Sequence, residues 1–365
     1  MKLIDSLTHK PETQTVSPRF KQVYIELSTH CNLSCRSCIR QSIIDFKKTH
    51  FSPLLMQKLL PMLETANLDR IVLLGFGEAL CNPHIKELLT ELREIDTRIV
   101  LVSNATFLTD DMASFLASLP LDELYVSWDD DIYGVDTEIR RGASAALFRN
   151  NIEALVAKIS EFRINRPLIG LQIVATKTNH RFIPGSIEYG KSIGIERFIV
   201  SNLYPYSAAM AGDVLYDDYS SKKIKLHKLL RHAVKRSRLT VANQDIHVNR
   251  RCPFIEKGTI FITAEGDIAT CPELAYTHPA FYSGKQRLHT RFILGNINCN
   301  TLEEIWNNKE FEELRNKFEY YEFPDCSFCQ HPDLCTLRIE KGYDCFDNLT
   351  PCGECLWARN IIICP

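Results

Sequence analysis

From residue 22 onward, short apolar runs alternate with longer amphipathic stretches. The runs are rich in β-branched and aromatic residues, which favours buried strands, and the stretches have the periodicity of helices. Six strands are expected, at 22–28, 70–76, 98–104, 123–128, 168–175 and 197–202. Five helices are expected between them, near 53–65, 84–94, 110–119, 144–162 and 183–193. Buried strands that alternate with helices predict βα units and a parallel sheet, so the expected fold class is α/β.

Six βα units predict a partial (β/α)6 TIM-like barrel, in which chemistry takes place at the carboxyl ends of the strands. Residues able to do chemistry fall there. Residues 31–38 follow the first strand, and residues 75–78 end the second. Asn104 ends the third strand and Asp129 follows the fourth. The sequence therefore predicts one site that several strands build together.

After Arg251 the pattern changes to short strands, turns and cysteines. Residues 261–263 and 267–269 flank Gly266 and predict a hairpin. Thr301, with Glu304 three positions later, forms a capping-box pattern that predicts a helix over 301–318. The segment after about residue 325 has too little apolar periodicity to fold alone, so bound metal is expected to stabilise it. The expected parts are a tail (1–20), the barrel (21–215), a charged linking helix (216–250) and a small cysteine-rich iron–sulfur domain (251–365).

Composition narrows the classes of function. The 365-residue chain is 45% hydrophobic and 24% charged, and its formal net charge of −2 does not suit a dedicated nucleic-acid binder. No apolar stretch is long enough to span a bilayer, and residues 1–19 lack the apolar core of a secretory signal. We therefore expect a cytoplasmic protein with neither a membrane nor a nucleic-acid partner. In that reducing compartment, its 14 cysteines indicate metal ligation or redox chemistry rather than disulfides.

Three cysteines are grouped near the start of the chain, as Cys31-x3-Cys35-x2-Cys38. Three soft thiolates in one loop suit an iron–sulfur cluster or zinc. Because no fourth ligand is close in sequence, one metal position would stay open for a substrate. A zinc loop that takes a distant fourth cysteine is the alternative.

This loop resembles the cluster motif of the radical S-adenosylmethionine superfamily. The stretch Gly75-Phe76-Gly77-Glu78 is similar to the family's glycine-rich element, which binds the methionine amino group. The resemblance implies that Ser127 contacts the ribose, that Arg140 binds the methionine carboxylate, and that Asn104 contacts the ribose or the methionine. Without a ligand, Arg140 could instead form a surface pair with Asp136 or Glu138, and Asn104 could be a turn residue.

Two further segments, 171–176 and 202–205, resemble those that enclose the adenine. One position departs from the family's pattern, because Ser37 stands where an aromatic residue usually precedes the third cysteine. The resemblance implies that a reduced [4Fe–4S] cluster passes one electron to S-adenosyl-L-methionine. The 5′-deoxyadenosyl radical that results abstracts hydrogen from a substrate. No further catalytic residue is identified.

The later cysteines resemble the SPASM extension of this superfamily, which carries one or two auxiliary clusters. The candidate ligands are Cys252, Cys271, Cys326, Cys329, Cys335, Cys345, Cys352, Cys355 and Cys364. By the family's pattern, the first auxiliary cluster takes Cys252, Cys271 and Cys345. The second takes Cys326, Cys329, Cys335 and Cys355. The spacing after Cys335 departs from that pattern, so Cys345, Cys352, Cys355 and Cys364 are not assigned firmly.

Three [4Fe–4S] clusters are therefore expected, with zinc as the alternative at the four-cysteine sites. Enzymes with this extension mostly modify peptides or proteins, so we expect such a substrate, bound through a leader or carrier, or an enzyme-bound cofactor. A ferredoxin or flavodoxin is the expected reductant. Residues 38–42 and 352–365 are similar to maturases associated with tungsten-cofactor oxidoreductases. A small-molecule dehydrogenase and a non-catalytic electron carrier or zinc scaffold are the competing hypotheses.

Overall fold

The computed structural model describes residues 19–44, 46–134, 139–162, 166–216, 224–230, 238–246, 250–282, 285–326, 329 and 342–365. Its centre is a ten-stranded sheet in the order β12-β9-β8-β1-β2-β3-β4-β5-β6-β7. The six strands expected from the sequence are confirmed and lie parallel to their neighbours: β1 (Gln22–Ile25), β2 (Arg70–Leu73), β3 (Arg98–Ser103), β4 (Glu123–Ser127), β5 (Leu168–Ala175) and β6 (Arg197–Asn202). The first four end before their expected limits, because the chain turns there into the loops that form the site.

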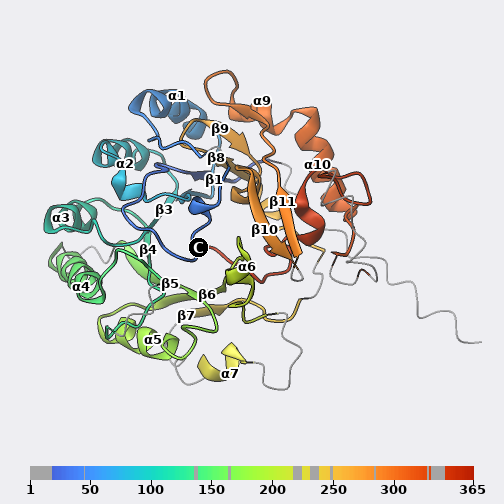
Figure 1. The fold of residues 1–365 in the computed structure, drawn as a ribbon. Helices are drawn as coiled ribbons and strands as arrows, with labels where there is room; N and C mark the ends of the chain where they lie inside the picture. Colours follow the sequence, from blue (N-terminus) through green and yellow to red (C-terminus); the bar gives the residue numbers. More distant parts are fainter. Residues whose placement is uncertain are drawn as a thin grey trace, which may run out of the picture.

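Helices cover the convex side of this curved sheet (Figure 1). They are α1 (Pro53–Glu64), α2 (Ile85–Arg93), α3 (Asp110–Ser118), α4 (Ala145–Phe162) and α5 (Ile183–Ser192). Two begin at side-chain caps: Ser52 accepts a hydrogen bond from the Leu55 N–H, and Thr109 accepts one from the Met112 N–H. The partial (β/α)6 barrel expected from the sequence is therefore the observed architecture.

The sheet continues into the cysteine-rich part of the chain. Strand β8 (Thr259–Ile262) pairs parallel to β1, and β9 (Asp267–Ala269) turns back antiparallel to β8. The expected hairpin is confirmed, and Gly266 makes its turn with a φ of +85°, which side chains rarely tolerate. Strand β12 (Gly295–Asn296) pairs with β9. The first strand of the cysteine-rich part, β8, thus pairs directly with the first barrel strand, β1. The domain boundaries stay a prediction.

Several elements differ from the sequence-based expectations. The helix expected over 301–318 is two helices, α9 (Leu302–Trp306) and α10 (Lys309–Glu319), because Asn308 caps a new helix by accepting the Phe311 N–H. The capping box of Thr301 and Glu304 is confirmed. Within the expected linking helix, α7 (Leu226–Leu230) is helical, while 217–223 and 231–237 lie outside the described residues. The short edge strand β7 (Arg238–Val241) was not predicted.

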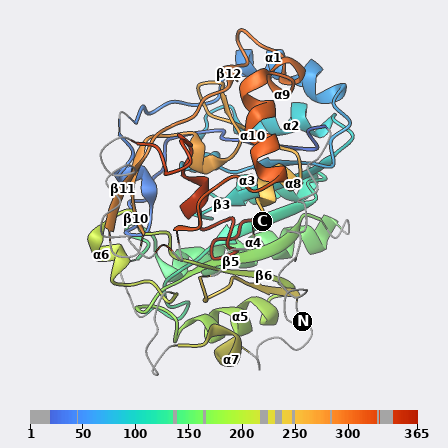
Figure 2. The ribbon, with the colours of Figure 1, turned by 90° about the vertical axis from the view of Figure 1, so that its right-hand side faces the viewer.

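A two-stranded hairpin, β10 (His278–Tyr282) and β11 (Lys285–His289), was also missed. It stands beside the short helix α6 (Ala208–Ala211) in both views (Figures 1 and 2), and the Phe281 N–H donates to the Pro205 carbonyl at 2.9 Å. The sequence pattern did not reveal this hairpin, because polar residues occupy buried positions and hide the alternation of apolar and polar residues. Its contact with Pro205 places the hairpin at one side of the barrel mouth.

The last residues of the chain lie inside the barrel (Figure 1). Asn202 at the end of β6 donates to the Ile361 carbonyl at 2.9 Å, and the Tyr24 hydroxyl donates to the Pro365 carbonyl at 3.3 Å. Leu356 and Ile361 are buried in the main hydrophobic core. The sequence-based interpretation of this segment as dependent on metal is therefore incomplete, because apolar packing also holds it. None of the described helices is long and apolar enough to cross a membrane.

Candidate active site

The carboxyl ends of β1 to β6 surround a cavity of about 280 Å³. Every residue predicted for the cluster loop and for S-adenosylmethionine lines it: Cys31, Cys35, Cys38, Gly75, Gly77, Glu78, Asn104, Ser127 and Arg140. These residues come from the ends of four strands and the loops that follow them, and they are widely separated in sequence. The structure thus brings the whole expected set to one place, as expected for parallel strands whose ends share an edge.

The three-cysteine loop follows β1 and is held in shape by backbone hydrogen bonds. The Arg36 N–H donates to the Ile139 carbonyl at 2.8 Å, and the Cys38 N–H donates to the Cys35 carbonyl at 3.2 Å. Burial raises the pKa of Cys35 to about 11 and also raises the pKa of Cys31. Such thiols ionise readily only beside a metal, so the loop fits an iron–sulfur cluster that stabilises the thiolates.

The glycine element after β2 has no room for side chains. A Cβ at Gly77 would lie 2.1 Å from the Ser28 carbonyl oxygen, and one at Gly75 would lie 2.2 Å from the Cγ of Glu26. Glu26, which directly follows β1, is fully buried, and its Oε1 accepts a hydrogen bond from the Phe76 N–H at 2.7 Å. Burial raises the pKa of Glu26 to about 6. Its other oxygen accepts the Tyr276 hydroxyl, so Glu26 joins the glycine turn to the cysteine-rich region.

Sequence reasoning missed Glu26. The signal was present, because Glu26 stands between the apolar residues Ile25 and Leu27, and an acidic residue in such a run is buried only when its oxygens are hydrogen-bonded. It holds the backbone of the glycine element rather than a ligand. Glu26 is therefore a positioning residue.

Replacing Glu26 with glutamine is expected to weaken S-adenosylmethionine binding about tenfold. The amide cannot accept on both sides as the carboxylate does, and each lost hydrogen bond costs about 1 kcal/mol. Equilibrium binding to the anaerobic, cluster-loaded protein measures the effect. Glu94→Gln, at an exposed carboxylate after α2, is the matched control. Unchanged affinity at full iron content would show that Glu26 does not position the glycine element.

Glu78 ties two strand ends together. Its Oε1 accepts the Ser103 hydroxyl at 2.8 Å, and its Oε2 accepts the Asn104 N–H at 2.6 Å. Asn104 in turn points its amide nitrogen at the Cys31 sulfur, 3.7 Å away. Asn104 is therefore more than a turn residue, because it contacts the cluster loop directly.

Arg140 is buried against Asp129, with 2.8 Å between its Nη1 and the Asp129 Oδ2. Burial lowers the pKa of Arg140, but the Asp129 carboxylate outweighs it and the pKa lies above its usual range. Asp136 and Glu138, the alternative partners, lie outside the described residues. Among the residues that are described, the Arg140 Nε has no hydrogen-bond partner.

Two other buried polar atoms on the cavity wall also lack partners in the described part of the chain: the Gln172 Oε1 and the Asn202 Oδ1. Orphaned buried atoms are rare and call for a ligand or water. Tyr204 and Tyr206 stack with ring centroids 4.7 Å apart and add aromatic surface to the same wall. Donors, acceptors and aromatic rings together fit a nucleoside joined to an amino acid, and the tyrosines give aromatic surface that Ser37 does not.

We expect Arg140→Lys to weaken S-adenosylmethionine binding by about tenfold or more. A lysine keeps the charge but loses the fork that can hold Asp129 and a ligand carboxylate together. Arg141→Ala, at the exposed neighbouring residue, is the control. The same binding titration serves for both, and equal affinities for the two variants would reject Arg140 as the carboxylate contact.

A second group of cysteines lies beside the barrel, with Cys252, Cys271 and Cys352 buried and Cys355 half-buried. Cys252 precedes α8 (Pro253–Glu256), Cys271 precedes η3 (Pro272–Leu274), and Cys352 lies in η7 (Pro351–Glu354), which Cys355 follows. Burial raises the pKa of Cys271 well above its usual value, and the charges of Cys252, Cys355 and Cys352 raise it further. Four thiolates in one apolar site would need a cationic partner, which an iron–sulfur cluster supplies.

The remaining candidate ligands lie elsewhere. Cys329 and Cys345 are exposed and Cys326 is half-buried, while Cys335 lies outside the described residues. Cys364 lines the active-site cavity, and the Trp357 indole N–H donates to its sulfur at 3.5 Å. The sequence-based grouping placed Cys355 in the second cluster and Cys345 in the first, whereas the structure brings Cys355 to Cys252 and Cys271.

Comparison with known families agrees with this geometry. Residues 25–172 match the model of the Radical SAM superfamily. The chain therefore carries a radical S-adenosylmethionine domain over residues 25–172. Residues 252–330 of this radical SAM enzyme match the SPASM model, an iron–sulfur cluster-binding domain. It is thus an S-adenosylmethionine-dependent iron–sulfur enzyme, and the hypothesis of a non-catalytic carrier or zinc scaffold is wrong.

Relatives of this radical SAM enzyme span nearly its whole length. It is 26% identical over 345 residues to the tungsten-containing aldehyde ferredoxin oxidoreductase cofactor-modifying protein of Pyrococcus furiosus, covering 94% of this chain and 97% of that protein. It is 25% identical over 331 residues to the AdoMet-dependent heme synthase of Methanosarcina barkeri, covering 87% and 90%. The likeness to tungsten-cofactor maturases expected from the sequence is therefore confirmed as a similarity.

Solved structures confirm the fold. Streptococcus suis SuiB bound to S-adenosylmethionine is similar with a TM-score of 0.59 at 15% identity, covering 88% of this chain and 73% of that one. SuiB has also been solved with its precursor peptide SuiA, at the same TM-score and 15% identity, covering 82% and 67%. The protein anSMEcpe with bound AdoMet gives 0.56 at 16% identity, covering 88% of both chains.

Proposed function

We propose that this enzyme is a maturase that modifies a peptide, a protein or an enzyme-bound cofactor. One observation carries the proposal. The cavity lined by Cys31, Cys35 and Cys38 is also lined by Trp357 and by Pro272, which directly follows Cys271 of the four-cysteine group. The auxiliary-cluster region therefore forms a wall of the space in which the reaction would take place.

The bound cluster and S-adenosylmethionine supply a one-electron reduction that yields methionine and a 5′-deoxyadenosyl radical. The protein's own part is positioning. The three thiolates of the loop would hold iron, while the backbone of Gly75 to Gly77 and the Arg140 guanidinium would hold the methionine. Ser127, Gln172 and Asn202 would bind the nucleoside. The apolar and aromatic wall would keep water away from the reacting carbon.

The buried geometry also supports a ligand set for each auxiliary cluster. We propose that Cys252, Cys271, Cys352 and Cys355 hold the first. Cys326, Cys329, Cys335 and Cys345 remain for the second, and Cys364 would serve neither. Each set then has four cysteines, the number that a fully ligated [4Fe–4S] cluster needs.

The relatives bear on the substrate. The Pyrococcus protein is named for modifying an enzyme cofactor, SuiB binds a precursor peptide, and the Methanosarcina protein is named a heme synthase. The first supports an enzyme-bound cofactor as the substrate of this chain, and the second supports a peptide. The heme synthase supports the competing function, in which the substrate is a free small molecule. A ferredoxin or flavodoxin would deliver the electron.

We expect the anaerobically reconstituted protein to hold about twelve irons, in three clusters of four. The first loop supplies three thiols for one cluster, and two further sets of four cysteines can each hold another. Iron and zinc are counted in the same desalted sample. Fewer than about eight irons together with stoichiometric zinc would reject the second auxiliary cluster.

Turnover in the presence of candidate substrates tests the function itself. The reduced enzyme is given a cofactor-bearing oxidoreductase, a peptide or a free tetrapyrrole, and 5′-deoxyadenosine is measured against a substrate-free sample. A substrate-dependent rise with a mass change on the protein, its cofactor or the peptide supports the maturase. A mass change only in the free small molecule would establish the dehydrogenase instead.

A further inference from the structure

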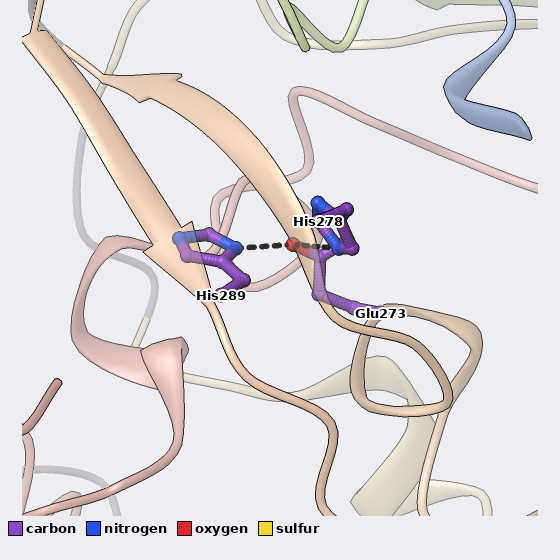
Figure 3. Close-up of side chains that lie close together, drawn as sticks. All are labelled: Glu273, His278 and His289. Carbon is purple, nitrogen blue, oxygen red and sulfur yellow. Dashed lines mark hydrogen bonds and ion pairs between the residues drawn. The ribbon is translucent and has the colours of Figure 1, made fainter. Parts of the chain in front are cut away.

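Three buried polar side chains meet at the base of the β10–β11 hairpin, outside the cysteine groups (Figure 3). His278 begins β10 and His289 ends β11, and the two are cross-strand partners. Glu273 comes from η3 and points between the two imidazoles (Figure 3). All three residues are at most 2% exposed.

The distances are those of a compact donor set. The Glu273 Oε1 lies 2.6 Å from the His289 Nδ1 and 3.5 Å from the His278 Nε2. One ligand atom from each residue lies within 4.8 Å of the other two. Two ligands on a tetrahedral zinc with bonds of about 2.0 Å lie about 3.3 Å apart, so the Glu273–His289 contact has to widen when the ion binds.

The hydrogen bonds of His278 leave one of its ring nitrogens without a hydrogen-bond partner in the described part of the chain. Its Nδ1 lies 3.0 Å from the Pro279 carbonyl, which can only accept, so the Nδ1 carries the proton. In a neutral ring the Nε2 then presents a lone pair to the Glu273 carboxylate. Within the described part of the chain, neither the His278 Nε2 nor the Glu273 Oε2 has a hydrogen-bond partner. Two buried acceptors that face each other are unfavourable unless a positive ion lies between them.

We propose that Glu273, His278 and His289 bind a divalent transition-metal ion of the zinc class. Two imidazoles and one carboxylate are ligands that suit zinc or ferrous iron. The site is separate from the cysteine sets, because no sulfur belongs to it.

The surroundings are those of a metal-bound histidine. The His289 Nε2 lies 2.9 Å from the Glu354 Oε1, so this ring can donate to a carboxylate while its Nδ1 binds the ion. Arg287 pairs with the second oxygen of Glu354 at 3.3 Å. The Tyr204 hydroxyl lies 2.5 Å from the Glu273 Oε1 and 3.3 Å from the His289 Nδ1, so it can complete four donors.

Burial indicates a structural role for the ion. A catalytic site keeps a position open to substrate, whereas this one is enclosed. The ion would join the hairpin to η3, which follows Cys271, and through Tyr204 to the active-site cavity. The competing arrangement has no metal, with His289 protonated between Glu273 and Glu354.

Zinc binding to the cluster-loaded enzyme tests the site. The holoenzyme is incubated with zinc ions and desalted, and zinc and iron are counted together so that intact clusters are verified. We expect about one zinc per chain, and at least a tenfold loss of affinity in His278→Ala and Glu273→Gln. His84→Ala, at an exposed histidine before α2, keeps the zinc.

X-ray absorption at the zinc edge of the wild-type holoenzyme needs no variant and separates this site from cysteine sites. Nitrogen and oxygen ligands without sulfur support the proposal. Sulfur ligation, no retained zinc, or equal zinc in the wild type and His278→Ala overturns it. If the variants fail to fold, the wild-type melting temperature decides, because an ion that binds only the folded state raises it. A melting temperature that is no higher with zinc than with a chelator would then contradict the site.

Discussion

Enzyme in which Cys31, Cys35 and Cys38 are all replaced by alanine is expected to form no 5′-deoxyadenosine and to keep about eight of about twelve irons. The three thiols lie on one loop after β1, whereas the other candidate ligands all follow Arg251. Removing the loop's ligands should therefore leave the auxiliary clusters bound. Product analysis under dithionite and iron counting of the same sample measure both effects.

Cys81→Ala is the control for this triple variant, because Cys81 lies near the loop but belongs to no ligand set. Burial raises the pKa of Cys81 to about 11, so this thiol stays protonated. The control should keep full iron and full cleavage. If the triple variant still cleaved S-adenosylmethionine, the assignment of the active cluster would be wrong, and if all iron were lost, the clusters would not be independent.

The second prediction concerns the buried cysteine group. We expect Cys271→Ala and Cys355→Ala each to remove about four irons, and the double variant to remove about four rather than about eight. The loss is not additive because both thiols are placed on one cluster. Binding of a structural metal contributes on the order of 10 kcal/mol to folding, so each variant should also melt at a lower temperature.

This design separates the structural grouping from the sequence-based one, in which Cys355 serves the second cluster. That grouping predicts the loss of about eight irons in the double variant. Cys299→Ala, at an exposed thiol after β12, is the matched control and should retain all iron. A double variant that lost about eight irons would restore the sequence-based assignment.

Local sequence determined much of this protein. The six barrel strands and the capping box of Thr301 depend on hydrophobic periodicity and on neighbours three positions apart, which can be read directly from the chain. The cysteine spacing and the glycine element are also local. They identified the superfamily and the residues that the structure gathers in one cavity, because parallel strands all end at the same edge.

Only the tertiary structure decided the contacts between distant segments. Cys355 joins Cys252 and Cys271 through the packing of the last residues inside the barrel, and no spacing rule specifies that path. Glu26 becomes a support of the glycine element because β2 and β8 both pair with β1. His278 and His289 meet Glu273 through the register of a hairpin whose polar residues face inward, against the usual alternation. Burial decides the chemistry of each, and burial is a property of the folded chain rather than of the sequence near any one residue.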